Sequence, residues 1–499
     1  MVLDELKYRI LQQFGFAPTQ EQGQALDTFA RFLTDKSPRV AMILRGSAGT
    51  GKTSLSGAIV RTLKIVGQKV MLLAPTGRAA KVFSLNSGCP AYTIHRRIYR
   101  EKSFSGVDGQ FNLNDNLYAD TLFMVDEASM VSNMGLGGFC TSSNGMGSTS
   151  FGSGCLLDDL VQFVYQGRND RLMLIGDKAQ LPPVGEEESP ALSRMVLEGY
   201  GLKVYECDLN EVLRQSQESG ILYNATVVRQ MITHDDITQL PLVRFHGFAD
   251  IVMVPGGDLV ESLANSYYQV GQDETMVITR SNKRANIYNN GIRNMVLDRE
   301  EQLSGGDMIM IVKNNYFWTE KEKKEMMAQQ PKDVAENSSL PSFLANGDRA
   351  KVLRVRNHIE LYGFRFATLL LQLPDYDDYE ISVTALLDTL CSEAPALTRE
   401  EQEKLFLGVE EDYQDVPLKA DRLKAIRTDS YYNALQVKYA YAITCHKAQG
   451  GQWEHVYVDQ GYMTDDMLTP DYIHWLYTAF TRAKSKLFLV NWPATQTVK

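Results

Sequence analysis

Residues 46–53 read GSAGTGKT, and this stretch decides the fold. It fits the pattern G-x-x-x-x-G-K-[ST], follows an apolar run at 40–46 and precedes a helical pattern, SLSGAIVRTLK, at 54–64. In this setting glycines let backbone N–H groups curl around phosphate oxygens, Lys52 reaches the terminal phosphates, and the hydroxyl of Thr53 can hold Mg²⁺. The stretch therefore predicts a phosphate loop that binds ATP with Mg²⁺. The residues predicted to hold the nucleotide here are Gly46, Ser47, Ala48, Gly49, Thr50, Gly51, Lys52 and Thr53.

Apolar runs on either side of this loop indicate the kind of sheet that carries it. Buried strands are predicted at 40–46, 69–75, 121–127 and 171–177, and each run ends in a polar or glycine-rich turn. Continuous apolar strands separated by helices are typical of a parallel sheet that is covered on both faces. Ligands of such sheets bind at the carboxyl ends of the strands. The predicted fold class is therefore α/β.

Two other strand ends supply groups for phosphate chemistry. Asp126 ends the run at 121–127 and is predicted to complete the Mg²⁺ site together with Thr53. Glu127 is placed to orient and deprotonate the attacking water. Gln180, in the stretch LIGDKAQLPPV, is predicted to reach the γ-phosphate or that water. The predicted catalytic residues of an NTPase are thus Lys52, Asp126, Glu127 and Gln180.

Composition sets the broad class of the protein. A chain of 499 residues is long enough for two to four domains. No apolar run of roughly 18 residues is present and the N-terminus lacks the pattern of a secretion signal, so we expect no membrane span. The six cysteines form no Cys-x-x-Cys pair, which predicts a cytoplasmic protein without a zinc site or an iron–sulfur cluster. The net charge of −10 does not decide whether the protein binds nucleic acid, because such binding depends on the local Lys and Arg residues at the phosphates.

The rest of the chain divides by its sequence patterns. A Gly/Ser-rich stretch at 135–155 has almost no apolar content and is predicted to be a flexible loop. A second α/β unit is predicted to begin near residue 203, and a β-rich insertion with turn signals interrupts it. The predicted domains are 1–202, then 203–302 together with 437–499, and the insertion at 303–436.

Within the second unit, the stretch YAITCHKAQG at 441–450 delivers several polar side chains at the end of a strand. It belongs to a series of motifs: GSAGTGKT, LAPTGRAAK, TIHRRIY, MVDEAS, IGDKAQLPPV, LNEVLRQ, YAITCHKAQG and YTAFTRAKSKL. In this order, from about residue 15 to 492, the chain resembles superfamily 1B of the DNA helicases, the branch of RecD, the Pif-type enzymes and the phage helicase Dda. The resemblance implies two RecA-like P-loop domains with parallel sheets. It also implies an SH3-like barrel at 303–436 and a small strand-separating pin at about 100–118.

The resemblance assigns further roles, residue by residue. Gln22 in PTQEQGQAL matches the glutamine that reads adenine, and Gly450 lies in the motif that relays toward ATP. Arg214 and Arg482 match the two arginines that approach the γ-phosphate from the second domain, where a guanidinium neutralises developing charge. The residues implied to bind DNA are Pro75, Thr76, Arg78, Lys81, Thr93, His95, Thr444, His446, Lys447 and Gln449.

The activity that the resemblance implies is ATP-dependent DNA unwinding. The enzyme would move 5′ to 3′ on single-stranded DNA, open tailed duplexes and work as a monomer in DNA repair, recombination or replication. Two alternatives stay open. The substrate is RNA in one of them, since no residue reads the 2′-hydroxyl unambiguously. In the other, the protein is an ATP-switched nucleic-acid-binding protein that unwinds nothing.

Overall fold

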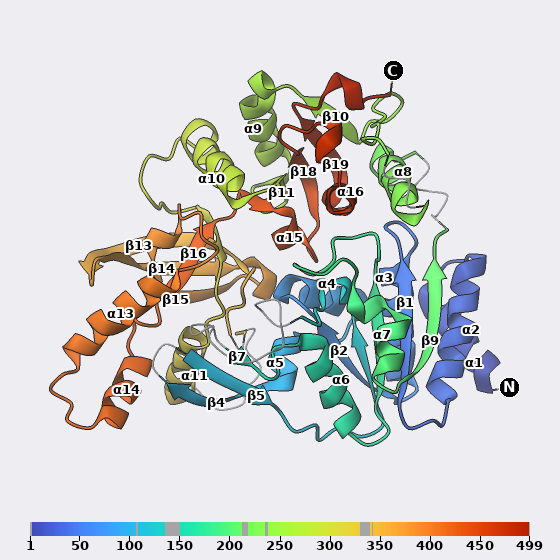
Figure 1. The fold of residues 1–499 in the computed structure, drawn as a ribbon, viewed down its shortest axis with the longest axis horizontal. Helices are drawn as coiled ribbons and strands as arrows, with labels where there is room; N and C mark the ends of the chain where they lie inside the picture. The colour runs from blue at the N-terminus through green and yellow to red at the C-terminus, as the bar shows by residue number, and fades with distance from the viewer. Residues whose placement is uncertain are drawn as a thin grey trace.

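Six parallel strands form the sheet that carries the phosphate loop (Figure 1). Their order is β3-β2-β6-β8-β1-β9. The strands are β1 (Val40–Gly46), β2 (Lys69–Ala74), β3 (Ala91–Thr93), β6 (Thr121–Val125), β8 (Arg171–Gly176) and β9 (Lys203–Leu209). The computed structural model describes residues 2–105, 108–134, 150–211, 218–234, 238–329, 340–341 and 343–498.

Residues 40–44 of strand β1 are apolar because their side chains enter two different cores. Met42 and Leu44 pack on one face of the sheet, and Ala41 and Ile43 pack on the other. The helices of the first face are α1 (Val2–Phe14), α2 (Gln20–Thr34), α3 (Lys52–Ile65) and α4 (Gly77–Ser87). Those of the second face are α5 (Ile94–Ile98), α6 (Leu156–Gln166) and α7 (Arg194–Gly199). The prediction of a parallel sheet covered on both sides is confirmed.

Strand β9 corrects one predicted boundary. Residues 203–209 were expected to open the second unit, but all seven pair in parallel register with β1, from Val40↔Lys203 to Gly46↔Leu209. The strand is an edge strand with a mixed polar sequence, KVYECDL, and lacks the continuous apolar run of its neighbours. The first sheet therefore extends beyond residue 202.

A second parallel sheet has the order β10-β19-β18-β11-β17. Its strands are β10 (Ile251–Val254), β11 (Thr275–Thr279), β17 (Ala442–Thr444), β18 (Trp453–Asp459) and β19 (Ala483–Val490). Its helices are α8 (Gly220–His234), α9 (Leu259–Val270), α10 (Asn282–Gly291), α15 (Cys445–Ala448) and α16 (Pro470–Phe480). In Figure 1 this sheet lies above the first one, and α15 lies at its lower edge, over α4.

The predicted β-rich insertion is a closed barrel. Its strands are β12 (Met308–Ile311), β13 (Arg349–Leu361), β14 (Phe364–Leu373), β15 (Tyr379–Leu386) and β16 (Leu435–Tyr439). Val352, Leu369, Leu371, Val383 and Val437 fill it and are buried. Three helices accompany the barrel (Figure 1): α11 (Phe317–Gln329), α13 (Arg399–Asp412) and α14 (Lys419–Arg427). The α/β class with two parallel sheets and a β-rich insertion is thus confirmed.

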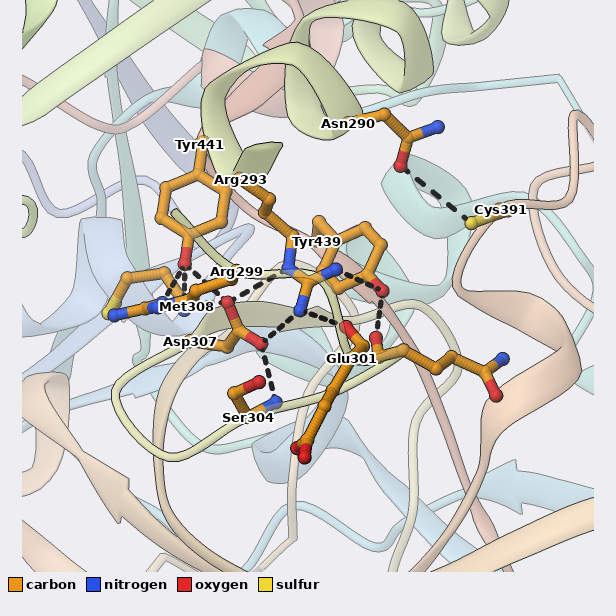
Figure 2. A network of polar contacts seen from close by, with 11 residues as sticks. Asn290, Arg293, Arg299, Glu301, Ser304, Asp307, Met308, Cys391, Tyr439 and Tyr441 are labelled. Carbon is orange, nitrogen blue, oxygen red and sulfur yellow. Dashed lines mark hydrogen bonds and ion pairs between the residues drawn. The ribbon is translucent and has the colours of Figure 1, made fainter. Parts of the chain in front are cut away.

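A buried ionic cluster joins the barrel to the second sheet (Figure 2). Asp307, just before β12, accepts hydrogen bonds from Nε and Nη2 of Arg293, both at 3.0 Å. Arg299 donates to the same carboxylate at 2.7 Å and the Tyr441 hydroxyl does so at 2.8 Å. Burial opposes the charge, but the bonds from Arg293 and its neighbours hold the pKa of Asp307 below its usual value. The cluster ties the chain entering the barrel to the chain leaving it, since Tyr441 follows β16.

Two smaller segments complete the first domain. The predicted pin region at 100–118 contains most of the antiparallel hairpin of β4 (Tyr99–Ser105) and β5 (Asp108–Leu113), and the short strand β7 (Ser150–Phe151) pairs with β5. Residues 135–149 of the predicted flexible loop lie outside the described residues, as does Arg214. Among the helices that the structure describes, none combines the length and apolar content needed to cross a membrane.

Candidate active site

The phosphate loop turns sharply between β1 and α3. Gly49 and Gly51 both have a φ of 78°, a left-handed conformation that favours glycine. A Cβ on Gly46 would lie 2.9 Å from the Thr50 hydroxyl oxygen, so the loop also closes tightly on itself. Lys52 begins α3, and its Nζ donates to the Gly46 carbonyl at 2.5 Å. The lysine thus lies along the loop, pointing back toward the end of β1.

A cavity of about 380 Å³ opens in front of this loop, between the two sheets. The first domain supplies Ser47, Ala48, Gly49, Gly51, Lys52, Thr53, Ser54, Asp126, Glu127, Asp177 and Gln180. The second supplies Ser219, Ile221, Leu222, Gln452, Thr481, Arg482, Ala483 and Lys484. The predicted catalytic residues Lys52, Asp126, Glu127, Gln180 and Arg482 therefore line one space, although more than four hundred positions separate the first from the last.

The two acids lie where β6 ends. Glu127 adopts a φ of 51°, which turns the chain so that its own N–H donates to Oδ1 of Asp126 at 2.9 Å. Burial raises the pKa of Asp126, and the neighbouring Glu127 raises it further. Such a carboxylate is stabilised by a cation, and with the Thr53 hydroxyl it forms a set of oxygen donors that suits Mg²⁺. The residues present therefore fit the expected metal.

Gln180 enters the cavity from the loop after β8. Its backbone N–H donates to the Asp177 carbonyl at 3.3 Å, which closes the turn. The side chain is buried, and its amide oxygen has no partner among the described residues. A buried amide group that lacks a partner is costly, so this one is placed to bind a ligand or a water in the cavity.

Arg482 faces these groups from the end of α16. Only 2% of the residue is exposed, and its donors go to neutral oxygens of its own domain. Nε donates to the Thr478 carbonyl at 3.0 Å, Nη1 to the Gly451 carbonyl at 3.1 Å, and Nη2 to the Thr481 hydroxyl at 3.1 Å. Among the described residues, these hydrogen-bond partners of Arg482 include no carboxylate. A buried guanidinium without a carboxylate partner attracts an anion in the cavity.

Four of the residues predicted to hold the nucleotide do not line the cavity: Gln22, Gly46, Thr50 and Gly450. Gln22 closes a capping box with Thr19, and its amide nitrogen donates to the Thr50 carbonyl at 2.9 Å. It thus supports the phosphate loop from behind and does not line the cavity. A Cβ on Gly450 would lie 3.1 Å from both Thr76 and Ala79 of the first domain, so this glycine permits close packing on α4.

The predicted nucleic-acid residues of the first domain lie at the starts of α4 and α5. Thr76 and Thr93 each cap a helix with the side-chain hydroxyl. Arg78 donates to the Gln452 carbonyl at 2.7 Å and lies over the Trp453 ring. Pro75 directly precedes the Thr76 cap, between β2 and α4. In this structure the arginine therefore bridges the two domains.

A second cavity, of about 360 Å³, separates α4 from the barrel. Lys81 and Thr93 line it from the first domain, and Tyr376 lines it from the barrel. Lys81 Nζ donates across it to the Pro374 carbonyl at 2.5 Å. The buried carboxyl of Asp348 lies under this wall, accepts a hydrogen bond from Tyr376 at 2.9 Å, and has its other oxygen against Gly77.

His95 does not line this cavity. Its ring lies 5.7 Å from the Tyr99 ring, and burial lowers its pKa to about 4. The imidazole is therefore neutral at physiological pH and can contact a phosphate only as a hydrogen-bonding group.

The second domain presents its predicted nucleic-acid residues on and beside the four-residue helix α15. Thr444 precedes this helix without a side-chain capping bond, and His446 is exposed. Burial lowers the pKa of Lys447. Gln449 is buried and donates to the Leu181 carbonyl at 2.7 Å, which links the helix to the loop that carries Gln180.

Sequence reasoning missed several contacts across the cleft. Tyr477 and Thr478 of α16 bind the loops around Ala48 and Leu181, and Arg229 of α8 donates to the Ser47 hydroxyl. Tyr477 and Thr478 lie inside the motif YTAFTRAKSKL, which was singled out for Arg482, but nothing in the motif indicated that these two side chains bind the first domain. No sequence signal singled out Arg229.

Comparison with known proteins agrees with this architecture. A family model described as AAA domain matches residues 18–148, and one described as UvrD-like helicase C-terminal domain matches 439–490. The ATP-dependent RecD2 DNA helicase of Deinococcus radiodurans is 29% identical over 167 residues, which cover 33% of this chain and 18% of that protein. The uncharacterized protein MJ1519 of Methanocaldococcus jannaschii is 24% identical over 523 aligned residues, 94% of this chain and 38% of that protein. The chain thus spans less than half the length of both relatives.

Among solved structures, the Pif1 helicase from Bacteroides in complex with ADP-AlF3 and ssDNA aligns at 14% identity over 97% of this chain and 95% of that chain, with a TM-score of 0.46. Pif1 helicase from Candida albicans aligns at 16% identity over 97% and 96%, with a TM-score of 0.40. The family models match the N-terminal phosphate-loop domain and the C-terminal motifs in the expected order. With the RecD2 similarity, they support a helicase of superfamily 1B, of the RecD and Pif type.

Proposed function

We propose that this chain is an ATP-dependent DNA helicase that moves 5′ to 3′ on single-stranded DNA and opens tailed duplexes. One observation carries the proposal. A single cavity is lined by Lys52, Asp126 and Glu127 from one domain and by Arg482 from the other, and this buried arginine binds only neutral oxygens of its own domain. Such a cavity makes hydrolysis depend on how the two domains sit, and this dependence is what a translocating motor needs.

The residues of the cavity divide the work of hydrolysis. Lys52 and the loop amides bind the phosphates, and Arg482 neutralises charge that develops on the transferred group. Glu127 orients the attacking water and accepts its proton, while Gln180 holds that water or the γ-phosphate. Mg²⁺, held by Thr53 and Asp126, would supply charge neutralisation on the phosphate oxygens.

The proposed DNA path follows the residues that surround the second cavity and α15. Thr76, Arg78, Lys81 and Thr93 belong to the first domain, and Thr444, His446 and Lys447 belong to the second, so closure of the cleft would change the spacing between two grips on one strand. Arg78 and Lys81 now bind carbonyl oxygens of the protein. Phosphate oxygens are stronger, charged acceptors and would replace these carbonyls.

We further propose that the hairpin of β4 and β5 separates the strands, and that the enzyme acts as a monomer in DNA repair, recombination or replication in the cytoplasm.

Steady-state ATP hydrolysis with and without single-stranded DNA tests the proposal first. Strong stimulation by DNA, lost in Lys52→Ala, supports a coupled motor. Stimulation by single-stranded RNA alone would redirect the proposal to RNA. A duplex with a 5′ tail and a matched duplex with a 3′ tail then test direction, since only the 5′-tailed one should be opened. ATP hydrolysis without opening of either duplex would favour the ATP-switched binding protein.

A further inference from the structure

The hydroxyl of Tyr477 joins three separate parts of the cleft. It donates to Oδ2 of Asp177 at 2.6 Å and accepts from the backbone N–H of Ala48 at 2.9 Å. Tyr477 belongs to α16 of the second domain, Ala48 to the phosphate loop, and Asp177 to the loop after β8. Only 1% of Tyr477 is exposed, so water does not compete for these bonds.

The acceptor of this bond is itself fixed. Asp177 is 3% exposed, and its Oδ1 accepts from the Ala179 N–H at 3.0 Å. Burial, and then the Asp177 charge, raise the pKa of Tyr477 well above its usual value, so the phenol keeps its proton and remains a donor. Hydrogen bonds to a charged group are stronger than neutral ones, and this one spans the domain boundary.

The next residue of α16 continues the connection toward Arg482. The Thr478 hydroxyl accepts from the Leu181 N–H at 2.8 Å, and the Thr478 carbonyl accepts from Arg482 Nε at 3.0 Å. The last turn of α16 therefore holds the loop that carries Gln180 on one side and the guanidinium of Arg482 on the other. Arg482 and Gln180 line the nucleotide cavity, whereas Tyr477 does not.

We propose that Tyr477 is a positioning residue for ATP hydrolysis, whose hydroxyl holds the phosphate loop and the Asp177 loop in register with the turn that presents Arg482. The inference rests on the proposed function and adds a residue to it. The phosphate loop of the first domain binds most of the nucleotide, so loss of the hydroxyl spares nucleotide binding. It loosens the alignment between Arg482 and the γ-phosphate, so the chemical step slows.

The test compares Tyr477→Phe with Tyr472→Phe in the full chain. Tyr472 is a matched control because it is a buried tyrosine of the same helix, whose hydroxyl donates to Gln460 at 2.5 Å instead. For Tyr477→Phe we expect kcat of DNA-stimulated hydrolysis to fall roughly 10-fold or more, the rate factor of one hydrogen bond to a charged group. Binding of a fluorescent ADP analogue and the melting temperature should stay near wild type. Tyr472→Phe should leave kcat unchanged.

Several results would overturn the inference. A kcat for Tyr477→Phe equal to that of wild type removes the positioning role, and so does a loss of ADP binding that accounts for the whole effect. If Tyr477→Phe does not fold, Asp177→Asn weakens the same bond, and an unchanged kcat in that variant is equally decisive. Wild-type protein that hydrolyses no ATP with any nucleic acid refutes the proposed function itself, and this is visible before the variants are compared.

Discussion

Arg482 donates from Nη1 to the carbonyl oxygen of Gly451 at 3.1 Å, so the end of α16 and the turn after α15 hold one guanidinium between them. The charge is thereby fixed at the edge of the nucleotide cavity before any phosphate arrives. A preorganised cation costs no rearrangement at the moment of reaction, which is where its effect on the rate originates.

Replacement of this arginine should slow hydrolysis far more than it weakens binding. For Arg482→Ala we expect DNA-stimulated kcat to fall about 1,000-fold or more, as for other arginines that stabilise phosphoryl transfer. Arg482→Lys should recover little, because an ammonium group cannot reproduce the three directed bonds of the fork. The measurement is kcat with saturating ATP and DNA, and a lysine variant with near-normal kcat would contradict the assignment.

Lys52 offers the sharpest test of the phosphate loop. Lys52→Ala removes the ammonium group that lies along the loop, and ATP turnover should fall roughly 100-fold or more. Lys64→Ala, an exposed lysine at the far end of the same helix, is the matched control and should keep full turnover. Circular dichroism of both variants should match wild type, since Lys52 makes its bond to the loop and not to the core.

The buried cluster at the barrel junction should dominate local stability. Asp307→Ala leaves two arginines without their carboxylate, and such a loss typically costs about 3–5 kcal/mol of unfolding free energy. Asp388→Ala breaks a more exposed pair with Arg365 on the same barrel and should cost less than about 1 kcal/mol. Chemical denaturation followed by circular dichroism compares the free energies of unfolding of the two variants. Equal costs would mean that the cluster of Figure 2 adds no specific stability.

Asp348 predicts a pH dependence of stability. Burial raises its pKa from 3.8 to about 7, so the folded protein keeps this proton through a range in which the unfolded chain has lost it. Stability contributed by the site therefore falls as pH rises from about 4 to about 7, because the folded state binds more protons than the unfolded state there.

Asp348→Asn removes this ionisation and keeps an oxygen that can accept from Tyr376. The melting temperature of the variant, relative to wild type, should rise between about pH 5 and about pH 8. Differential scanning fluorimetry at both values measures it. Parallel curves for the two proteins would show that Asp348 ionises normally in the folded state.

Local patterns in the sequence predicted the parts of this structure that depend on near neighbours. The phosphate loop is recognisable from its glycines and the strand before it. Strands β1, β2, β6 and β8 are recognisable as apolar runs because both of their faces are buried. Strand β9 has only one fully paired side in the sheet and a mixed sequence, so nothing local assigned it to β1.

The partners of polar side chains were beyond the reach of such patterns. Tyr477 and Asp177 are 300 positions apart, and only the packing of two domains brings their oxygens to 2.6 Å. Gln22 carries an amide that suits a base, but in the fold its two ends bind Thr19 and Thr50. A sequence motif therefore predicts which polar side chain is present at a site, whereas its hydrogen-bond partner is determined by the tertiary structure.

The cluster around Asp307 also governs how this protein can be rearranged. The chain enters the barrel beside Arg293 and Asp307 and leaves it through Tyr439 and Tyr441, and all four side chains meet in one buried contact set. A barrel transplanted from a related protein would bring strands that fit one another, but it would leave the charged groups of this buried cluster without their partners. Recombination at 303 and 436 should therefore yield insoluble chimaeras, while exchange of a segment that includes 293–307 and 439–441 should yield folded ones.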